Sequence, residues 1–399
     1  MNATTMTLPH ARGTAGIERL TFGLLLAFVA SLQISIALAN ILLATTMLTW
    51  AITLVRDRTR PAAPPFFLPL VAYGAVTLVS AAFSMDPRTS FIDCKQLVLF
   101  AIVPLIYDVV QRERTATVVD VIVTVGAASA AYGIIQYAML HYDNLGRRPE
   151  GALTHYMTYS GILMLVICAA AARLIFGARD RVWPALVMPA LVVALSLTFT
   201  RSAFVGACVA VGLLFILKDF RLTALLPVVI ALLFAFAPGQ VANRMMSMFS
   251  AVPDATNQDR LAMVEVGVRM VTDHPLTGVG PNMVPKLYAQ YRPEYGVNQT
   301  NPHLHNVPLQ IAAERGLPAL AVWLWFLTTL AMSLFRLFRQ HREPLAAAAL
   351  AAIAAMLAAG FFEYNFGDSE FLMMFLVLIT LPFAAATRGG PSAPAAAPR

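Results

Sequence analysis

Two histidines, His303 and His305, stand two residues apart in a long polar stretch of an otherwise strongly apolar chain. Histidine is the side chain best suited to take and return a proton near neutral pH. Asn306 is a residue type that caps helix N-termini, so we predict a short helix over 307–315, stopped by Gly316. The partial positive charge at that N-terminus attracts anions and disfavours imidazolium. The pattern therefore predicts a neutral, proton-accepting histidine beside an anion site.

A metal centre is a second interpretation of a histidine pair. Zinc sites usually add cysteines or a third histidine close by. Cys94, Cys168 and Cys208 are odd in number and form no CxxC pair, so neither a zinc site nor a disulfide framework is supported. The chain also has no Asp-rich motif of the kind that holds a metal beside nucleotide phosphates. We predict no metal and no cofactor.

The elements that must position these histidines are membrane helices. The chain has 399 residues, 59% hydrophobic and 12% charged, and its mean hydropathy of +0.70 lies far outside the soluble range. Long apolar runs without alternating strands favour helices over an outer-membrane barrel. We predict an all-α polytopic membrane protein with about 12 transmembrane helices of roughly 20 residues each. They lie near residues 18–35, 37–55, 64–84, 92–110, 115–139, 153–175, 182–199, 201–218, 221–237, 317–337, 344–361 and 369–386.

The distribution of lysine and arginine predicts the orientation, because the inner loops of membrane proteins collect positive charge. With both termini inside, the short inner loops and tails hold most of the cations, including Arg56, Arg58 and Arg60. The short outer loops hold few. The net charge of +7 is then mainly a topology signal plus affinity for anionic membrane lipids, and nucleic acid need not be invoked. We predict a multi-pass protein whose histidine loop faces outward.

One large outer segment interrupts the membrane helices. In it, residues 259–272 carry an apolar stripe at helical spacing after a capping Asn257, and a Gly/Pro-rich turn follows. The N-terminus lacks a convincing cleavage site, so we expect its first helix to be retained. Four parts follow: transmembrane helices 1–9 in 1–237, the outer loop in 238–316, transmembrane helices 10–12 in 317–387, and a disordered tail in 388–399.

Four motifs follow one another in the back half of the chain. They are Thr198-Phe199-Thr200-Arg201-Ser202, Arg260 opening the loop helix, His274-Pro275-Leu276-Thr277-Gly278-Val279-Gly280, and His303-Leu304-His305-Asn306 with Leu309-Gln310. This series resembles the lipopolysaccharide O-antigen ligase/polymerase superfamily. The front half matches only in hydropathy. The turn and histidine motifs together are fairly specific for the superfamily, but they discriminate poorly among its members.

The resemblance implies a GT-C-like helical architecture and metal-independent, inverting glycosyl transfer at the periplasmic face of a bacterial inner membrane. Members take glycan from undecaprenyl pyrophosphate. A ligase places it on a sugar hydroxyl of lipid A-core, a polymerase extends the glycan, and a protein O-oligosaccharyltransferase modifies protein hydroxyls. The span count and the single large late loop favour the ligase. A transporter or flippase is the alternative from another class, but the ionisable groups cluster at the outer edge rather than at mid-membrane.

For such a reaction, arginines that hold the leaving pyrophosphate would stabilise the transition state. Guanidinium stays charged and matches the geometry of phosphate. Arg201, at the outer junction of two spans, and Arg260, in the first turn of the loop helix, are the leading candidates, and Arg147 and Arg148 form a second outer pair. The ordinary alternatives are that Arg201 and the pair bind lipid phosphates and that Arg260 pairs with Asp259.

For the catalytic base, His305 is preferred to His303 because it directly precedes the helix cap and fits the family's His-Asn pair. Asp368, before the last span, is predicted either to orient a histidine or to bind amines of the acceptor. With Glu363 and Glu370 it would otherwise form a solvated acidic rim or a weak cation site.

Overall fold

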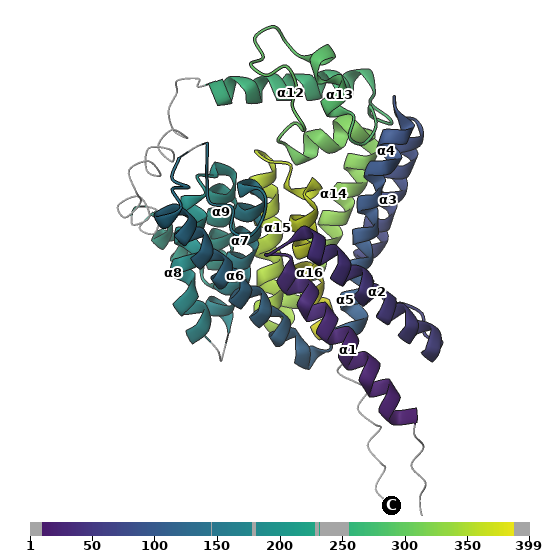
Figure 1. The fold of residues 1–399 in the computed structure, drawn as a ribbon, viewed down its shortest axis with the longest axis vertical. Coiled ribbons are helices and arrows are strands. Elements are labelled where there is room, and N and C mark those ends of the chain that lie inside the picture. The colour runs from purple at the N-terminus through teal and green to yellow at the C-terminus, as the bar shows by residue number, and fades with distance from the viewer. Residues whose placement is uncertain (1–9, 145, 178–180, 228–230, 232–254, 387–399) are drawn as a thin grey trace, which may run out of the picture.

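Upright helices form a bundle, and two further helices, α12 and α13, lie at one end of it (Figure 1). The computed structural model describes residues 10–144, 146–177, 181–227, 231 and 255–386, and within these ranges it contains helices and loops but no strand. The α-helices are α1 (His10–Ser31), α2 (Ile36–Asp57), α3 (Phe67–Ala82), α4 (Pro87–Asp93), α5 (Ile102–Val109), α6 (Thr115–Met139), α7 (Tyr156–Phe176), α8 (Val182–Leu197), α9 (Arg201–Lys218), α12 (Ala255–Asp273), α13 (Val284–Tyr291), α14 (Val307–His341), α15 (Pro344–Gly360) and α16 (Ser369–Ala386). Short 3-10 helices are η1 (Cys94–Ala101), η2 (Arg112–Arg114), η3 (Phe220–Leu225) and η4 (Asn365–Gly367).

The all-helical, membrane-type prediction is confirmed for this part of the chain. Seven of its helices are long and apolar enough to cross a membrane, and α3, α8 and α15 are shorter apolar helices. The predicted spans 115–139, 201–218 and 369–386 coincide with α6, α9 and α16. The total of twelve stays a prediction, because most of 221–237, the first part of the outer loop and the tail 388–399 lie outside the described residues.

Two predicted elements differ in detail. The span predicted at 92–110 is not one continuous α-helix but the succession α4, η1 and α5. Pro104 contributes to this break, because it has no N–H to donate to the carbonyl of Phe100 in an α-helical ladder. The loop helix predicted over 259–272 exists as α12, which begins at Ala255 and so includes Asn257 within its first turn.

The centre of the bundle is made of α7, α15 and α16. Residues on nearly every face of α7 and α16 are buried, which explains why their sequences are apolar all round. The alanine-rich α15 packs against α7, α9, α14 and α16. Its small side chains let neighbouring backbones approach closely, as at many helix contacts in membranes. On the outside, α2 exposes large apolar side chains suited to lipid, such as Ile41, Leu48 and Val55.

A kink divides α14 into two helical parts. Gly316 has φ 82° and ψ 168°, outside the helical region, so the short helix predicted to end there is confirmed, although a second part continues in the same element. Pro318 follows and has no N–H, so the carbonyl of Glu314 loses the donor that a regular helix would give it. Buried carbonyls without donors are costly.

The Gly/Pro-rich turn before α13 supplies the missing partners. Its backbone runs against the kink and forms three hydrogen bonds there: Val279 N–H to Ala313 O at 2.9 Å, Gly280 N–H to Glu314 O at 2.9 Å, and Leu317 N–H to Pro275 O at 2.8 Å. The outer segment is thus joined to the bundle through backbone atoms.

Side chains of α3 and α4 extend this junction. Ser80 of α3 donates its hydroxyl to Thr277 O at 2.6 Å and to Glu314 O at 3.0 Å. Lys286 of α13 contacts Asp86, the cap of α4, at 2.6 Å between Nζ and Oδ2. Polar contacts with both α3 and α4 therefore hold the outer segment.

Replacing Gly316 by alanine is expected to lower stability. A Cβ at this position would lie 2.2 Å from Leu276 O, and the positive φ is strained for any L side chain. The free energy of unfolding should fall by about 1–3 kcal/mol or more, since this is the usual cost of a forced backbone conformation. It is measured as a fall in Tm in detergent. Gly23→Ala is the control, since a methyl there meets nothing within 4 Å; equal Tm values for both variants would contradict this account.

Candidate active site

The segment between α13 and α14 turns its two histidines to one side. Leu304, between them, is buried in the apolar core of the outer segment, and its N–H donates to Gln310 Oε1 at 2.6 Å. Because Leu304 points into that core, the side chains on either side of it point away. The rings of His303 and His305 meet edge to face, with centroids 4.2 Å apart.

Asn306 fixes where this segment enters α14. Its Oδ1 accepts the N–H of Leu309 at 2.9 Å, so the predicted helix cap is confirmed. Its Nδ2 donates to Phe361 O at 3.2 Å. The same side chain therefore caps the helix and holds the loop between α15 and α16, which carries Glu363.

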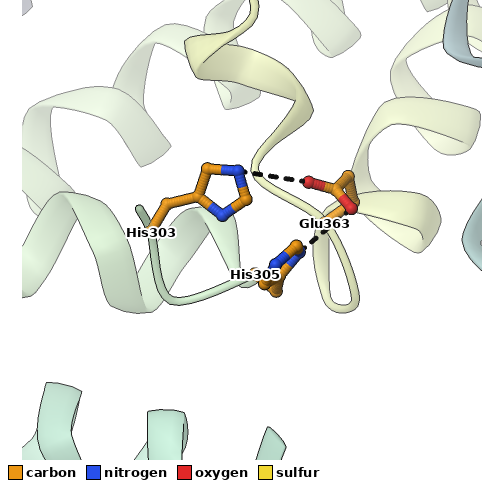
Figure 2. A group of neighbouring side chains, drawn as sticks. All are labelled: His303, His305 and Glu363. Carbon is orange, nitrogen blue, oxygen red and sulfur yellow. Dashed lines mark hydrogen bonds and ion pairs between the residues drawn. The ribbon is translucent and has the colours of Figure 1, made fainter. Parts of the chain in front are cut away.

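Glu363 faces both histidines (Figure 2). Its Oε2 lies 3.0 Å from His305 Nδ1, and its Oε1 lies 3.7 Å from His303 Nε2. The side chain is only 13% exposed, so Glu363 is not part of a solvated rim. An ionised carboxylate can only accept, so Nδ1 of His305 carries the shared proton and Nε2 keeps a free lone pair.

Burial strongly affects the protonation of His303 and Glu363. Burial, with smaller contributions from the charges of His305 and His155, lowers the pKa of His303 to about 4. For Glu363, burial raises the pKa, but the hydrogen bond from His305 and the charges of both imidazoles outweigh it and leave the pKa below its usual value. His303 is thus neutral at neutral pH. The main cause is burial, whereas the sequence pointed to the helix N-terminus.

The same three residues have the composition of a metal site. One ligand atom from each of His303, His305 and Glu363 lies within 4.8 Å of the others. The sequence did not indicate this group, because the third donor lies in a different loop. A tetrahedral zinc ion with bonds of about 2.1 Å needs donor atoms about 3.4 Å apart. The 3.0 Å and 3.7 Å contacts of Glu363 with His305 and His303 lie on either side of that separation, so the three side chains have the spacing of metal donors as well as that of a hydrogen-bonded group.

A cavity of about 250 Å³ opens beside these residues, between α7, α9, α15 and α16. Asp368 lines it together with His303 and Glu363. The carboxylate of Asp368 accepts from the Thr158 hydroxyl and, at 2.9 Å, from the N–H of Phe371 in the first turn of α16. In the described contacts it is therefore Glu363 that orients a histidine, while Asp368 joins α7 to α16. The predicted role of Asp368, to orient a histidine or to bind amines of the acceptor, stays a prediction.

The predicted arginines fall into separate places. Arg148 lies over the ring of Tyr156 at 4.2 Å. Burial lowers the pKa of its guanidinium, and the positive charge of Arg201 adds to this effect. Arg201 opens α9, and Ser202 and Ala203 after it line the cavity.

Arg147 and Arg260 lie elsewhere. Arg147 lies over the ring of Tyr142 at 4.2 Å and donates to its hydroxyl at 3.1 Å, so the predicted pair 147–148 is split between two aromatic partners. Arg260 of α12 lies 5.9 Å from the ring centroid of Phe362, the residue before Glu363. The loop that carries the carboxylate therefore also contacts a predicted phosphate-binding cation.

Sequence reasoning undervalued Glu363 and missed His155, which also lines the cavity. Both are ionisable residues close to the ends of apolar helices, α15 and α7. An ionisable group at such a place is costly near hydrocarbon and often has a functional reason. That signal was present, but it did not indicate which histidine Glu363 would meet.

Acidification is expected to destabilise the fold through His303. Its folded pKa of about 4 lies below the ordinary value of 6.5, so the unfolded chain binds the proton first. The stability that depends on an uncharged His303 is fully present above pH 6.5 and is lost as the pH falls from 6.5 towards 4. The loss should be no more than about 3 kcal/mol. Thermal unfolding in detergent across this window checks it: His303→Gln should lose less stability than the unsubstituted protein, and identical pH dependence would refute the assignment.

Comparison with known proteins bears on this site. A family model described as O-antigen ligase matches residues 184–324, from α8 to the middle of α14. The matched stretch contains Arg201, Arg260 and both histidines. No curated protein gives a significant match. The family match agrees with the motif resemblance in the same stretch, and it supports the assignment of residues 184–324 to the O-antigen ligase/polymerase superfamily.

Proposed function

We propose that the protein is an O-antigen ligase, which transfers glycan from undecaprenyl pyrophosphate to a sugar hydroxyl of lipid A-core. The family match supports glycosyl transfer of the ligase/polymerase type. The observation that carries the proposal is the pairing of His305 with Glu363, a carboxylate that is 13% exposed and lines the cavity. A sugar hydroxyl is a weak nucleophile and needs a positioned base.

In the proposed reaction, His305 is that base. Its Nε2 takes the proton of the acceptor hydroxyl while the hydroxyl oxygen attacks the anomeric carbon and inverts it. Glu363 holds the ring through Nδ1–H, and its negative charge stabilises the imidazolium that forms. His303 is neutral at working pH and so does not oppose the new charge.

The leaving group departs from the opposite side of the anomeric carbon. The bond to the pyrophosphate oxygen breaks, and its electron pair leaves with the polyprenyl pyrophosphate. Arg201 and Arg148 supply positive charge near the cavity, and Arg260 supplies it beside Phe362. Arg147 contributes less, because Tyr142 already holds it. These cations perform the neutralisation that a metal would otherwise supply, so the transfer is proposed to be metal-independent.

The surroundings of the base suit substrates that are anchored in a bilayer. Phe361 and Phe362, next to Glu363, are 57% and 43% exposed and present an apolar surface beside the site. The opposite end of the bundle, where α6 and α15 begin and α14 ends, carries Arg112 and Arg342. By the positive-inside rule that end is cytoplasmic. The site then faces the periplasm of an inner membrane.

An acceptor panel tests the function. Purified protein is given a defined undecaprenyl pyrophosphate glycan together with lipid A-core, a hydroxyl-bearing peptide or a second lipid-linked glycan, each with and without EDTA. We expect product on lipid A-core alone and no loss of rate with EDTA. Growth of the glycan instead would identify a polymerase, and product on the peptide would identify a protein O-oligosaccharyltransferase. Loss of activity with EDTA, restored by a divalent metal, would overturn metal independence.

Glu363→Gln is expected to lower kcat about 100-fold with little change in KM, because the amide retains a hydrogen-bond acceptor but not the charge that stabilises the imidazolium. Initial rates of transfer to lipid A-core measure the effect. Glu294→Gln, at an exposed glutamate of the outer segment that carries the two histidines, should leave the rate unchanged. His305→Asn combined with Glu363→Gln should be no slower than His305→Asn alone, since both act in one step. Additive losses would show that the two residues act separately.

A further inference from the structure

His155 is an exposed histidine at the start of α7 whose tautomer is fixed by the fold. Its Nδ1 accepts the N–H of Met157 at 3.3 Å and so caps the helix. A nitrogen that accepts carries no proton, so the proton of the neutral ring sits on Nε2. The capping contact therefore leaves His155 with an N–H donor on the other side of its ring.

The ring of His155 belongs to a stack of three side chains. It lies on the ring of Tyr156 with centroids 4.6 Å apart and planes at 28°. The guanidinium of Arg148 lies 4.2 Å from the centroid of the same tyrosine ring. Tyr156 thus carries both a donor imidazole and a cation against its ring, and the charge of Arg201 acts on that cation. Planar donors held by stacking are pre-organised for phosphate.

His155 also lines the cavity beside the proposed base. His303 and Glu363 line the same cavity. The charge of His155 affects the pKa of both His303 and Asp368, so it lies near to both. The residue therefore lies on the same cavity as His303, the neighbour of the proposed base, and directly precedes Tyr156, over which Arg148 lies.

We propose that His155 is a phosphate ligand of the donor, with Nε2–H donating to a non-bridging oxygen of the polyprenyl pyrophosphate beside Arg148 and Arg201. The N-terminus of α7, a helix of 21 residues, adds partial positive charge at the same place. This assignment rests on the proposed function, because it takes the lipid-linked pyrophosphate as the donor. It gives His155 a binding role that its capping contact alone does not require.

His155→Asn separates the two roles. Asparagine is among the best capping residues, so it preserves the cap of α7 while removing the Nε2–H donor. The probe is undecaprenyl pyrophosphate without glycan, titrated into purified protein in detergent. We expect Kd to rise about tenfold, as for the loss of one charge-assisted hydrogen bond, with no change in Tm. His155→Ala should show the same weakened binding together with a lower Tm.

His141→Asn is the matched control. His141 is exposed, lies in the same connection between α6 and α7, and has φ 57°, a conformation that asparagine tolerates. It should bind the probe as the unsubstituted protein does. His155→Asn with an unchanged Kd would overturn the assignment and reduce His155 to a helix cap. Failure of the unsubstituted protein to bind the probe or to transfer glycan would instead overturn the proposed function.

Discussion

The backbone junction at Gly316 determines where the candidate site lies. Helix α14 cannot continue regularly through Gly316 and Pro318, and the freed carbonyls of Ala313 and Glu314 need donors because they are buried. The turn that contains Val279 supplies them. The kink in α14 and the turn that contains Val279, which are separate in the sequence, thus satisfy each other's backbone hydrogen bonds. Since the first part of α14 begins at the histidine segment, the direction of α14 before the kink fixes the position of that segment over the bundle.

Buried charge reinforces this junction on the bundle side. Arg315, next to the kink, is 5% exposed. It contacts Glu314 at 3.0 Å, the hydroxyl of Tyr364 at 3.3 Å and Asp93 of α4 at 3.6 Å. A buried ion pair gives little net stability, but removing one partner costs several kcal/mol (about 3–5), so such a group strongly disfavours other arrangements. Because Tyr364 follows Glu363 directly, the network also restricts the loop that brings the carboxylate to the histidines.

The sequence predicted the elements better than their meeting points. Apolar runs and caps gave the helices and the start of α14 at Asn306, because these depend on local chemistry. The histidine pair was recognised from residue type and place. Its partner was not, because Glu363 lies in a separate loop and only tertiary packing selects it over Asp368. For a similar reason the sequence did not indicate that Arg147 and Arg148 lie over different tyrosines, a choice that spacing does not reveal.

The competition between the helix N-terminus and the carboxylate explains how two adjacent histidines acquire different roles. A helix N-terminus disfavours a positive ring by about 0.3–1 kcal/mol, whereas a charge-assisted hydrogen bond contributes about 1.5–3 kcal/mol. His305 has the 3.0 Å contact with Glu363, so the carboxylate outweighs the helix for the charge that this ring acquires during proton transfer. His303 is 3.7 Å from the same carboxylate and half-buried, and for His303 the cost of desolvation dominates, so the ring stays neutral. Because Glu363 lies at unequal distances from the two rings, His305 can act as the base while His303 stays uncharged. Only Leu304 separates these two histidines in the sequence.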